Sequence, residues 1–243
     1  AGLAIASRFT AQIRGYNQGV RNAADAISLA QTAEGAYDEM ASNLQRIREL
    51  AVQAANATNS STDRLAIQTE ISDLKAEIIR VTHTQFNGVE VIGTQAGSFY
   101  FQVGPNGVKS IDGVIVNTIN VRVDNTFASV ATATDATVYV AGGDATTMTN
   151  AALSLIGRVD NLLQVINTQR AILGAVQNRF ESVIRNGENI SEQLSASRSR
   201  IQDADFAKET AALTKAQILQ QAGTTVLSQA NAVPQSVLAL LQG

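Results

Sequence analysis

Few side chains in this sequence could carry acid, base, nucleophilic or metal chemistry. His83 is the only histidine, cysteine is absent, and no GxxxxGK phosphate-binding loop occurs. A zinc site or a serine-histidine-aspartate triad needs several such groups together, and no HExxH pattern surrounds His83. We therefore assign His83 a structural or solvated role. The 21 acidic residues are scattered along the chain, so that chance pairs on solvated helical faces are expected. The sequence predicts no enzyme activity, no cofactor and no metal site.

A short charged segment is a candidate for contact with another protein. Arg46, Glu49 and Leu50 are spaced by three and four residues, which places them near one surface of a helix. Such a pattern favours a solvated face or a face that packs against another subunit.

The last stretch of the chain has an unusual lack of charge. Residues 216–243 contain no Asp, Glu, Lys or Arg, and large apolar residues recur every seven positions at Leu219, Val226, Val233 and Leu240. This heptad spacing predicts a helix that buries a seam against neighbouring helices. Its many Gln, Thr and Asn residues are too polar for a membrane span, and a membrane-surface helix would carry Lys or Arg on its polar face. We expect other chains to cover it in a large assembly.

Composition narrows the class of partner. The formal net charge is −3, which gives no electrostatic basis for binding nucleic acid. No apolar run is long enough to span a membrane, and the absence of cysteine excludes disulfides. Aromatic residues make up only 5% of the chain, so that Ala, Leu, Ile and Val must do most of the packing, as in closely approaching helices.

Helical spacing dominates both ends of the chain. Apolar residues separated by three or four positions run from Ile5 to Ala51 and predict one long rod-like helix. The polar cluster at 56–63 predicts a reversal, and a second helix at about 67–81 should lie back along the first as an antiparallel hairpin. The same spacing returns from Ile156 to about Ile201, which completes a bundle.

The middle of the chain has a different pattern. Alternation at Phe99–Val103 and at Ile119–Val123 predicts a small β region, and residues 128–149 are expected to form exposed, variable loops. The predicted fold is therefore mainly α with a small β region: a long antiparallel helical rod plus a C-terminal helix. We divide the chain into rod residues 1–96, an outward β-rich region at 97–150, a rod helix at 151–202 and a terminal helix at 203–243, in which Pro234 predicts a bend or stop.

Both flanks of the chain resemble bacterial flagellins. The stretches that carry the resemblance are AGLAIASRFTAQIRGYNQGVRNAADAISL and QTAEGAYDEMASNLQRIRELAVQAANAT near the start, THTQFNGVEVI at 82–92, LGAVQNRFESVI at 173–184, SRSRIQDADFAKETAALTKAQILQQAGTTVLSQAN at 197–231 and VPQSVLALL at 233–241. Ungapped matches of this length are far more specific than a short motif. Only residues 97–150 are poorly covered.

The resemblance implies a structural subunit of the extracellular flagellar filament. Its partners would be other flagellin subunits, with the export chaperone, cap and junction proteins, and its paired chain ends would line an axial tube. It also implies that a vertebrate Toll-like receptor recognises Arg46, Leu50 and Glu70, and that cytosolic immune sensors read Leu238, Leu240 and Leu241. The chain begins at Ala1 without Met, and relative to the family we expect a truncated N-terminus, impaired export and assembly, and a loosely held terminal helix.

Two other functional hypotheses stay open at this stage. The chain could be a flagellin-like surface adhesin or receptor for host or glycan ligands, with residues 97–145 as the binding region. An enzyme inserted into the middle region is less favoured, because that region contains neither His nor Cys.

Overall fold

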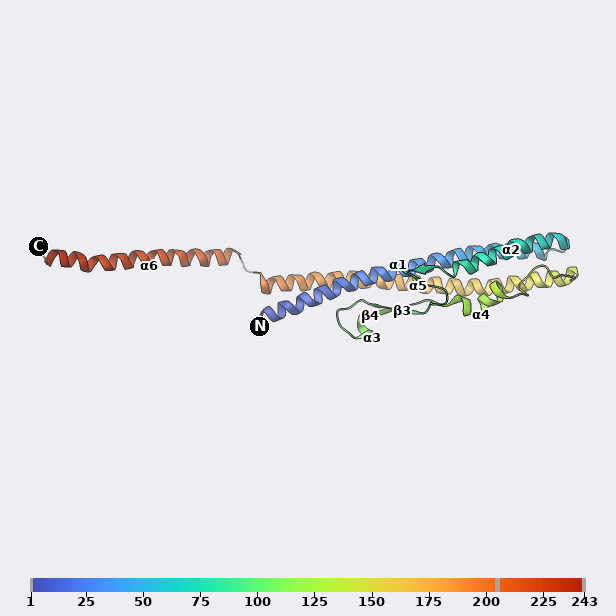
Figure 1. Ribbon diagram of the computed structural model, residues 1–243, viewed down its shortest axis with the longest axis horizontal. Coiled ribbons are helices and arrows are strands. Elements are labelled where there is room, and N and C mark those ends of the chain that lie inside the picture. Colours follow the sequence, from blue (N-terminus) through green and yellow to red (C-terminus); the bar gives the residue numbers. More distant parts are fainter. Residues whose placement is uncertain (1, 204–205, 242–243) are drawn as a thin grey trace. The chain divides into compact units, whose positions relative to one another are not determined.

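The chain is built around three long helices. The computed structural model describes residues 2–203 and 206–241, with side chains described for 2–203 and 208–231. The long helices are α1 (Gly2–Ala55), α2 (Ser61–Val81) and α5 (Ala145–Gln202), and α6 (Phe206–Leu241) follows them (Figure 1). By its internal contacts the chain forms two compact units, residues 11–194 and residues 1–10 with 195–243.

The reversal between α1 and α2 is fixed by a capping box. Ser60 accepts a hydrogen bond from the backbone N–H of Asp63 at 3.2 Å, and the Asp63 carboxylate accepts one from the backbone N–H of Ser60 at 2.9 Å. These bonds satisfy two backbone donors that a helix N-terminus leaves free. Because the chain turns here, α2 runs antiparallel to α1, as the sequence predicts.

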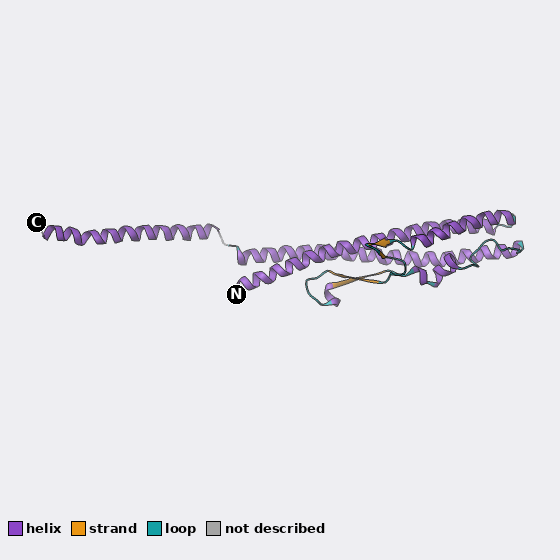
Figure 2. Cartoon of the chain, viewed as in Figure 1, coloured by secondary structure: helices purple, strands orange, loops and turns teal. Residues whose placement is uncertain are grey.

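Helix α5 runs antiparallel to α1 in the larger unit. Three polar contacts join them: Arg48 to Asp160 at 2.7 Å, Arg170 to Asp38 at 3.0 Å, and Gln177 to Glu34 at 2.8 Å. The partner on α5 moves up the sequence as the residue on α1 moves down, which is the order of an antiparallel pair. The predicted helical bundle is thereby confirmed (Figure 2).

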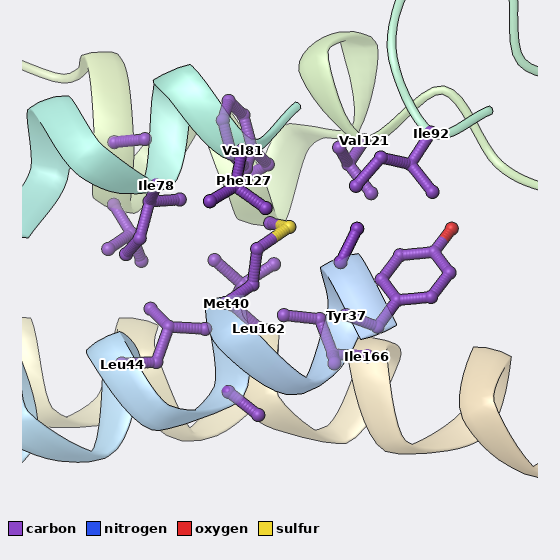
Figure 3. Packing of buried hydrophobic residues seen from close by; sticks show 14 of the residues in the cluster. Tyr37, Met40, Leu44, Ile78, Val81, Ile92, Val121, Phe127, Leu162 and Ile166 are labelled. Carbon is purple, nitrogen blue, oxygen red and sulfur yellow. The ribbon is translucent and has the colours of Figure 1, made fainter. Parts of the chain in front are cut away.

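The core of the larger unit is a continuous apolar seam. Figure 3 shows Tyr37 and Met40 of α1 among residues of α2, α5 and the middle region. Alanines contribute much of the α1 surface in this core, which lets the helices approach closely. Within the larger unit, the fully or almost fully buried alanines of α1 are Ala23, Ala26, Ala30, Ala33, Ala36, Ala41, Ala51 and Ala54.

Two β-hairpins follow α2. Strands β1 (Gln85–Phe86) and β2 (Val89–Glu90) are joined by Asn87 and Gly88, which have φ of 50° and 80°. Two positive φ values in a two-residue loop match the tight turn that Asn-Gly favours. The second hairpin pairs β3 (Ser98–Gln102) with β4 (Gly113–Asn117) in antiparallel register, and the short helix α3 (Lys109–Asp112) lies between them.

The structure corrects two details of the middle region. Residues 119–123, predicted as a strand, contain the 3-10 turn η1 (Val121–Val123), and the partner of β3 is β4 instead. Segment 128–149 is not an exposed loop throughout. It contains the π-helical turn η2 (Ala128–Thr132) after the short helix α4 (Asn125–Phe127), and Val130 and Val138 are fully buried. Apolar side chains there complete the core, which outweighs the loop-like composition.

Helix α5 begins earlier than its apolar spacing predicts. Asp144 accepts a hydrogen bond from the backbone N–H of Thr147 at 2.7 Å, which caps the first turn. In the smaller unit, α6 is one helix that does not end at Pro234. Of the helices in the described part of the chain, none has the length and hydropathy required to cross a bilayer.

Candidate assembly and recognition surfaces

Arg46 and Glu70 form an exposed ion pair between α1 and α2. The Arg46 Nε and Nη2 atoms lie 2.9 and 2.7 Å from Oε1 of Glu70, and Nη1 lies 3.2 Å from Oε2 of Glu49. Hydrogen bonds to Glu70 and then to Glu49 raise the pKa of Arg46. The sequence-predicted residues Arg46 and Glu70 are thus brought together on the surface. Leu50 is not part of this exposed surface, because it is buried, with only 2% of the residue exposed.

The apolar stripe of α6 is exposed where the structure describes it. Leu219 and Val226 are 62% and 66% exposed. Their partners in the heptad, Val233 and Leu240, lie outside the residues whose side chains are described, as do Leu238 and Leu241. Exposure of large apolar residues at a regular spacing, on a helix that has no charged residue from position 216 onward, is typical of a surface that another protein covers.

His83 belongs to a small polar cluster at the end of α2. Its Nδ1 lies 2.7 Å from Oε1 of Glu90, and its Nε2 lies 3.3 Å from Nη1 of Arg122. Glu90 also accepts two hydrogen bonds from Thr94 at 2.8 Å. The bonds from His83 and then Thr94 lower the pKa of Glu90 to about 2. These contacts tie the loop 83–95 together, and among the described residues no three His, Asp or Glu side chains converge as a metal site would require.

Two glycines of α1 let the second hairpin dock closely. A Cβ placed on Gly19 would lie 2.6 Å from the carbonyl carbon of Val103, and one on Gly15 would lie 2.6 Å from Cβ of Pro105. One turn further along α1, Asn22 donates a hydrogen bond to the carbonyl oxygen of Gln102 at 2.7 Å. These positions are four and three residues apart, at Gly15, Gly19 and Asn22, and therefore lie on one face of the helix. This spacing is visible in the sequence and could have indicated the docking face.

Arg64 is a fully buried cation at the turn between α1 and α2. Its guanidinium donates hydrogen bonds to the carbonyl oxygens of Asn56 and Ala145, both at 3.1 Å, and to the hydroxyl of Thr149 at 3.3 Å. It therefore joins the end of α1 to the start of α5. No spacing rule distinguishes this arginine from exposed ones, which explains why the sequence gives no sign of it.

Comparison with known proteins places the chain in a family. Residues 1–95 match the family described as the bacterial flagellin N-terminal helical region, and residues 156–241 match the bacterial flagellin C-terminal helical region. The chain is 44% identical to a flagellin of Halalkalibacterium halodurans over 100% of this chain and 84% of that protein. It is 40% identical to flagellin FlaB2 of Treponema pallidum, over 100% of this chain and 85% of the relative.

A solved structure has the same architecture. The crystal structure of Bacillus cereus flagellin is similar with a TM-score of 0.54 and 29% identity, over 69% of this chain and 88% of the solved one. None of these similarities favours the adhesin hypothesis. Flagellins are structural proteins that form the extracellular flagellar filament, and the two matched helical regions confirm that role here. The chain is a structural subunit of the bacterial flagellar filament and belongs to the bacterial flagellin family.

Proposed function

We propose that α6 carries the contacts between copies of this filament subunit, and that the subunit catalyses no reaction. The observation that supports this proposal is the exposed stripe of Leu219 and Val226 on a helix without charge from residue 216 onward. Burying one Leu or Val side chain contributes about 1.5–3 kcal/mol. A heptad of such residues, repeated around a filament, supplies a strong and non-directional force for assembly. Val233 and Leu240 continue the same seam in this proposal.

The parts of the chain have separate roles in this arrangement. Residues 1–96 and 151–202 form the rod, residues 97–150 lie outward, and residues 203–243 form the filament core. The stripe on α6 would also need cover before assembly, because an exposed apolar helix associates with other surfaces. We therefore include an export chaperone, and the cap and junction proteins of the flagellum, among the partners of this chain.

A charge placed in the stripe tests the assembly role. Val226→Glu is introduced into the chromosomal gene, so that the protein is tested at its natural length, and filaments are examined by electron microscopy. We expect filaments to be lost, because an unpaired buried carboxylate costs several kcal/mol in each contact. The larger unit should keep its helical circular dichroism, since Val226 is 66% exposed.

A matched control places the same charge elsewhere on α6. Gln221 lies two residues after Leu219, on the opposite face of the helix. Gln221→Glu should therefore retain filaments in this proposal. Normal filaments from the Val226→Glu strain, or equal loss from both variants, would remove the stripe from the assembly role.

We also propose that the Arg46–Glu70 surface is where a vertebrate Toll-like receptor binds. Both side chains are about half exposed, at 51% and 47%, and they present an ion pair at a junction of two helices. Leu50 supports this surface from below, because it is buried in the single chain. A receptor-reporter assay on Arg46→Ala should show a weaker response than Arg80→Ala, which removes the exposed Arg80–Glu77 ion pair of α2. Equal responses from the two variants would count against this site.

A further inference from the structure

The chain contains Asn-Gly pairs, the dipeptide in which asparagine most readily loses ammonia without an enzyme. These pairs are Asn87-Gly88, Asn106-Gly107 and Asn186-Gly187. In this reaction the backbone nitrogen of the glycine attacks the side-chain carbonyl carbon of the asparagine. Glycine favours the attack because it has no Cβ and leaves the backbone free to rotate. The fold then decides which pair reacts, since the two atoms meet only where the local backbone can rearrange.

The pair in α5 is held in a geometry that prevents the attack. Asn186 and Gly187 lie inside this helix, far from both of its ends. The backbone N–H of Gly187 is therefore engaged with a carbonyl oxygen one turn earlier, as in any helix interior. Gly187 is also buried, and a Cβ on it would lie 3.0 Å from Cγ2 of Val20. Part of α5 must unfold before Asn186 can react.

The pair in the first hairpin is protected by its turn. Asn87 and Gly88 form the two-residue loop between β1 and β2, and Phe86 pairs with Val89 across it. Asn87 is exposed, and its φ of 50° lies in the left-handed region. Ring formation requires the backbone around Asn87 to rotate, and in so short a loop this rotation disrupts the pairing of the strands.

Asn106 and Gly107 have no such protection. They lie in the loop between β3 and α3, in neither a helix nor a strand, and both are exposed. Within the described part of the chain, the backbone N–H of Gly107 has no hydrogen-bond acceptor. A Cβ on Gly107 would meet nothing within 4 Å, so that the loop has space to rearrange. We propose that Asn106 is the site at which the folded chain deamidates and isomerises spontaneously.

The reaction consumes water, releases ammonia and needs no oxidant or cofactor. The backbone nitrogen of Gly107 loses its proton and bonds to Cγ of Asn106, and the Cγ–Nδ2 bond breaks as ammonia leaves. Water then opens the ring at either of its carbonyl carbons. Opening at Cγ restores the peptide bond and leaves aspartate at position 106. Opening at the backbone carbonyl carbon leaves isoaspartate, in which the chain runs through Cβ. Either product adds a negative charge to the loop.

The new charge lies beside an existing carboxylate. Nδ2 of Asn106, the atom that leaves, is 3.5 Å from Oδ1 of Asp112, and only 5% of Asp112 is exposed. In the aspartate product a carboxylate oxygen replaces this amide donor, so that two like charges face each other where little water separates them. The adjacent Pro105 lies against Gly15 of α1. Deamidation should therefore weaken the docking of this loop on α1.

Ageing of the purified chain at mildly alkaline pH tests the site. Samples are digested at intervals, and mass spectrometry with chromatographic separation of aspartate from isoaspartate measures the conversion at each Asn-Gly pair. In the folded chain Asn106 should convert at least about tenfold faster than Asn87 or Asn186, because those two react only after local opening. The same chain in concentrated urea is the control, and there the three pairs should convert at similar rates.

A second variant tests the role of the loop glycine. Gly107→Ala fits the open space at this position without a positive φ, and it should slow the conversion of Asn106 about tenfold or more, because a Cβ restricts the backbone. For the effect of the product, Asn106→Asp should melt at a lower temperature near neutral pH than Asn106→Ser. The serine variant removes the amide without adding a charge.

Each result either supports or overturns the proposal. Equal conversion of the three pairs in the folded chain, or faster conversion at Asn87 or Asn186, would show that the loop does not select the site. An unreacted Asn106 in folded protein, over a time in which the urea-treated chain converts, would also refute it. If Asn106→Asp melts no lower than Asn106→Ser, the repulsion from Asp112 is wrong.

Discussion

Replacing Gly19 with alanine should loosen the second hairpin from α1. The new Cβ would lie 2.6 Å from the carbonyl carbon of Val103, roughly 1 Å closer than an ordinary carbon contact. The new Cβ would meet the backbone of Val103, just after β3. This backbone cannot rotate out of the way as a long side chain can. Overpacking of this kind costs about 1–3 kcal/mol, whereas Gly→Ala inside a helix gains about 0.5–1 kcal/mol. We expect a net loss of stability.

Gly35 provides a control on the same helix. A Cβ at Gly35 would meet nothing within 4 Å, so that Gly35→Ala should show only the helical gain. The two variants should then differ by about 1–3 kcal/mol in the free energy of unfolding. Urea denaturation followed by circular dichroism measures this difference.

Amide exchange locates the effect of Gly19→Ala. Protection of residues in β3 should fall because the hairpin separates from α1, while protection in α2 should change little. If Gly19→Ala stabilises the chain as much as Gly35→Ala does, with β3 protection intact, the close docking described above would be wrong.

Three further predictions concern individual polar contacts. Arg64→Met should lower the free energy of unfolding by about 1–3 kcal/mol, because the carbonyl oxygens of Asn56 and Ala145 lose a charged hydrogen-bond donor. Chemical denaturation checks this, and an unchanged midpoint would contradict it. Glu90 has a folded pKa of about 2 against an ordinary 4.5, so that its contribution to stability is present above pH 4.5 and is lost as the pH falls toward 2. The melting temperature of Glu90→Gln should therefore fall less than that of the wild type over this pH range. Parallel curves of melting temperature against pH for the two proteins would argue against the contact. Arg46→Ala should leave the melting temperature nearly unchanged, since its ion pair is exposed. A marked fall in the melting temperature would show that this pair is structural.

Helical parts of the fold can be predicted from sequence because each has a long, repeated pattern. The three-and-four spacing from Ile5 to Ala51 agrees with α1, and the polar cluster around Ser60 agrees with the observed capping box. These signals are local, so that neighbouring residues alone carry them. The heptad pattern of α6 is also a local signal. It indicates a seam that other helices cover, and Leu219 and Val226 of this seam are exposed in the single chain.

The middle region could not be predicted as well because tertiary contacts decide it. Alternation at 119–123 is a valid strand signal, yet Val121 is buried in a 3-10 turn, where its backbone N–H bonds to the carbonyl oxygen of Ile92 at 3.1 Å. The burial of Val130 and Val138 likewise depends on the surfaces of distant helices.

The same limit applies to the candidate sites. Arg46 and Glu70 form an ion pair between α1 and α2, and Glu70 was associated with Arg46 through the family resemblance and not through spacing. Spacing places Leu50 near Arg46 on the helix, but Leu50 is buried, because whether a helical position faces solvent depends on the segments that pack against it.

A helical reconstruction of the native filament by electron cryomicroscopy tests the central claim most directly. The account predicts that Leu219 and Val226, exposed in the single chain, are buried between helices of neighbouring copies in the filament. A map in which these two side chains face solvent, while other surfaces hold the copies together, would contradict it.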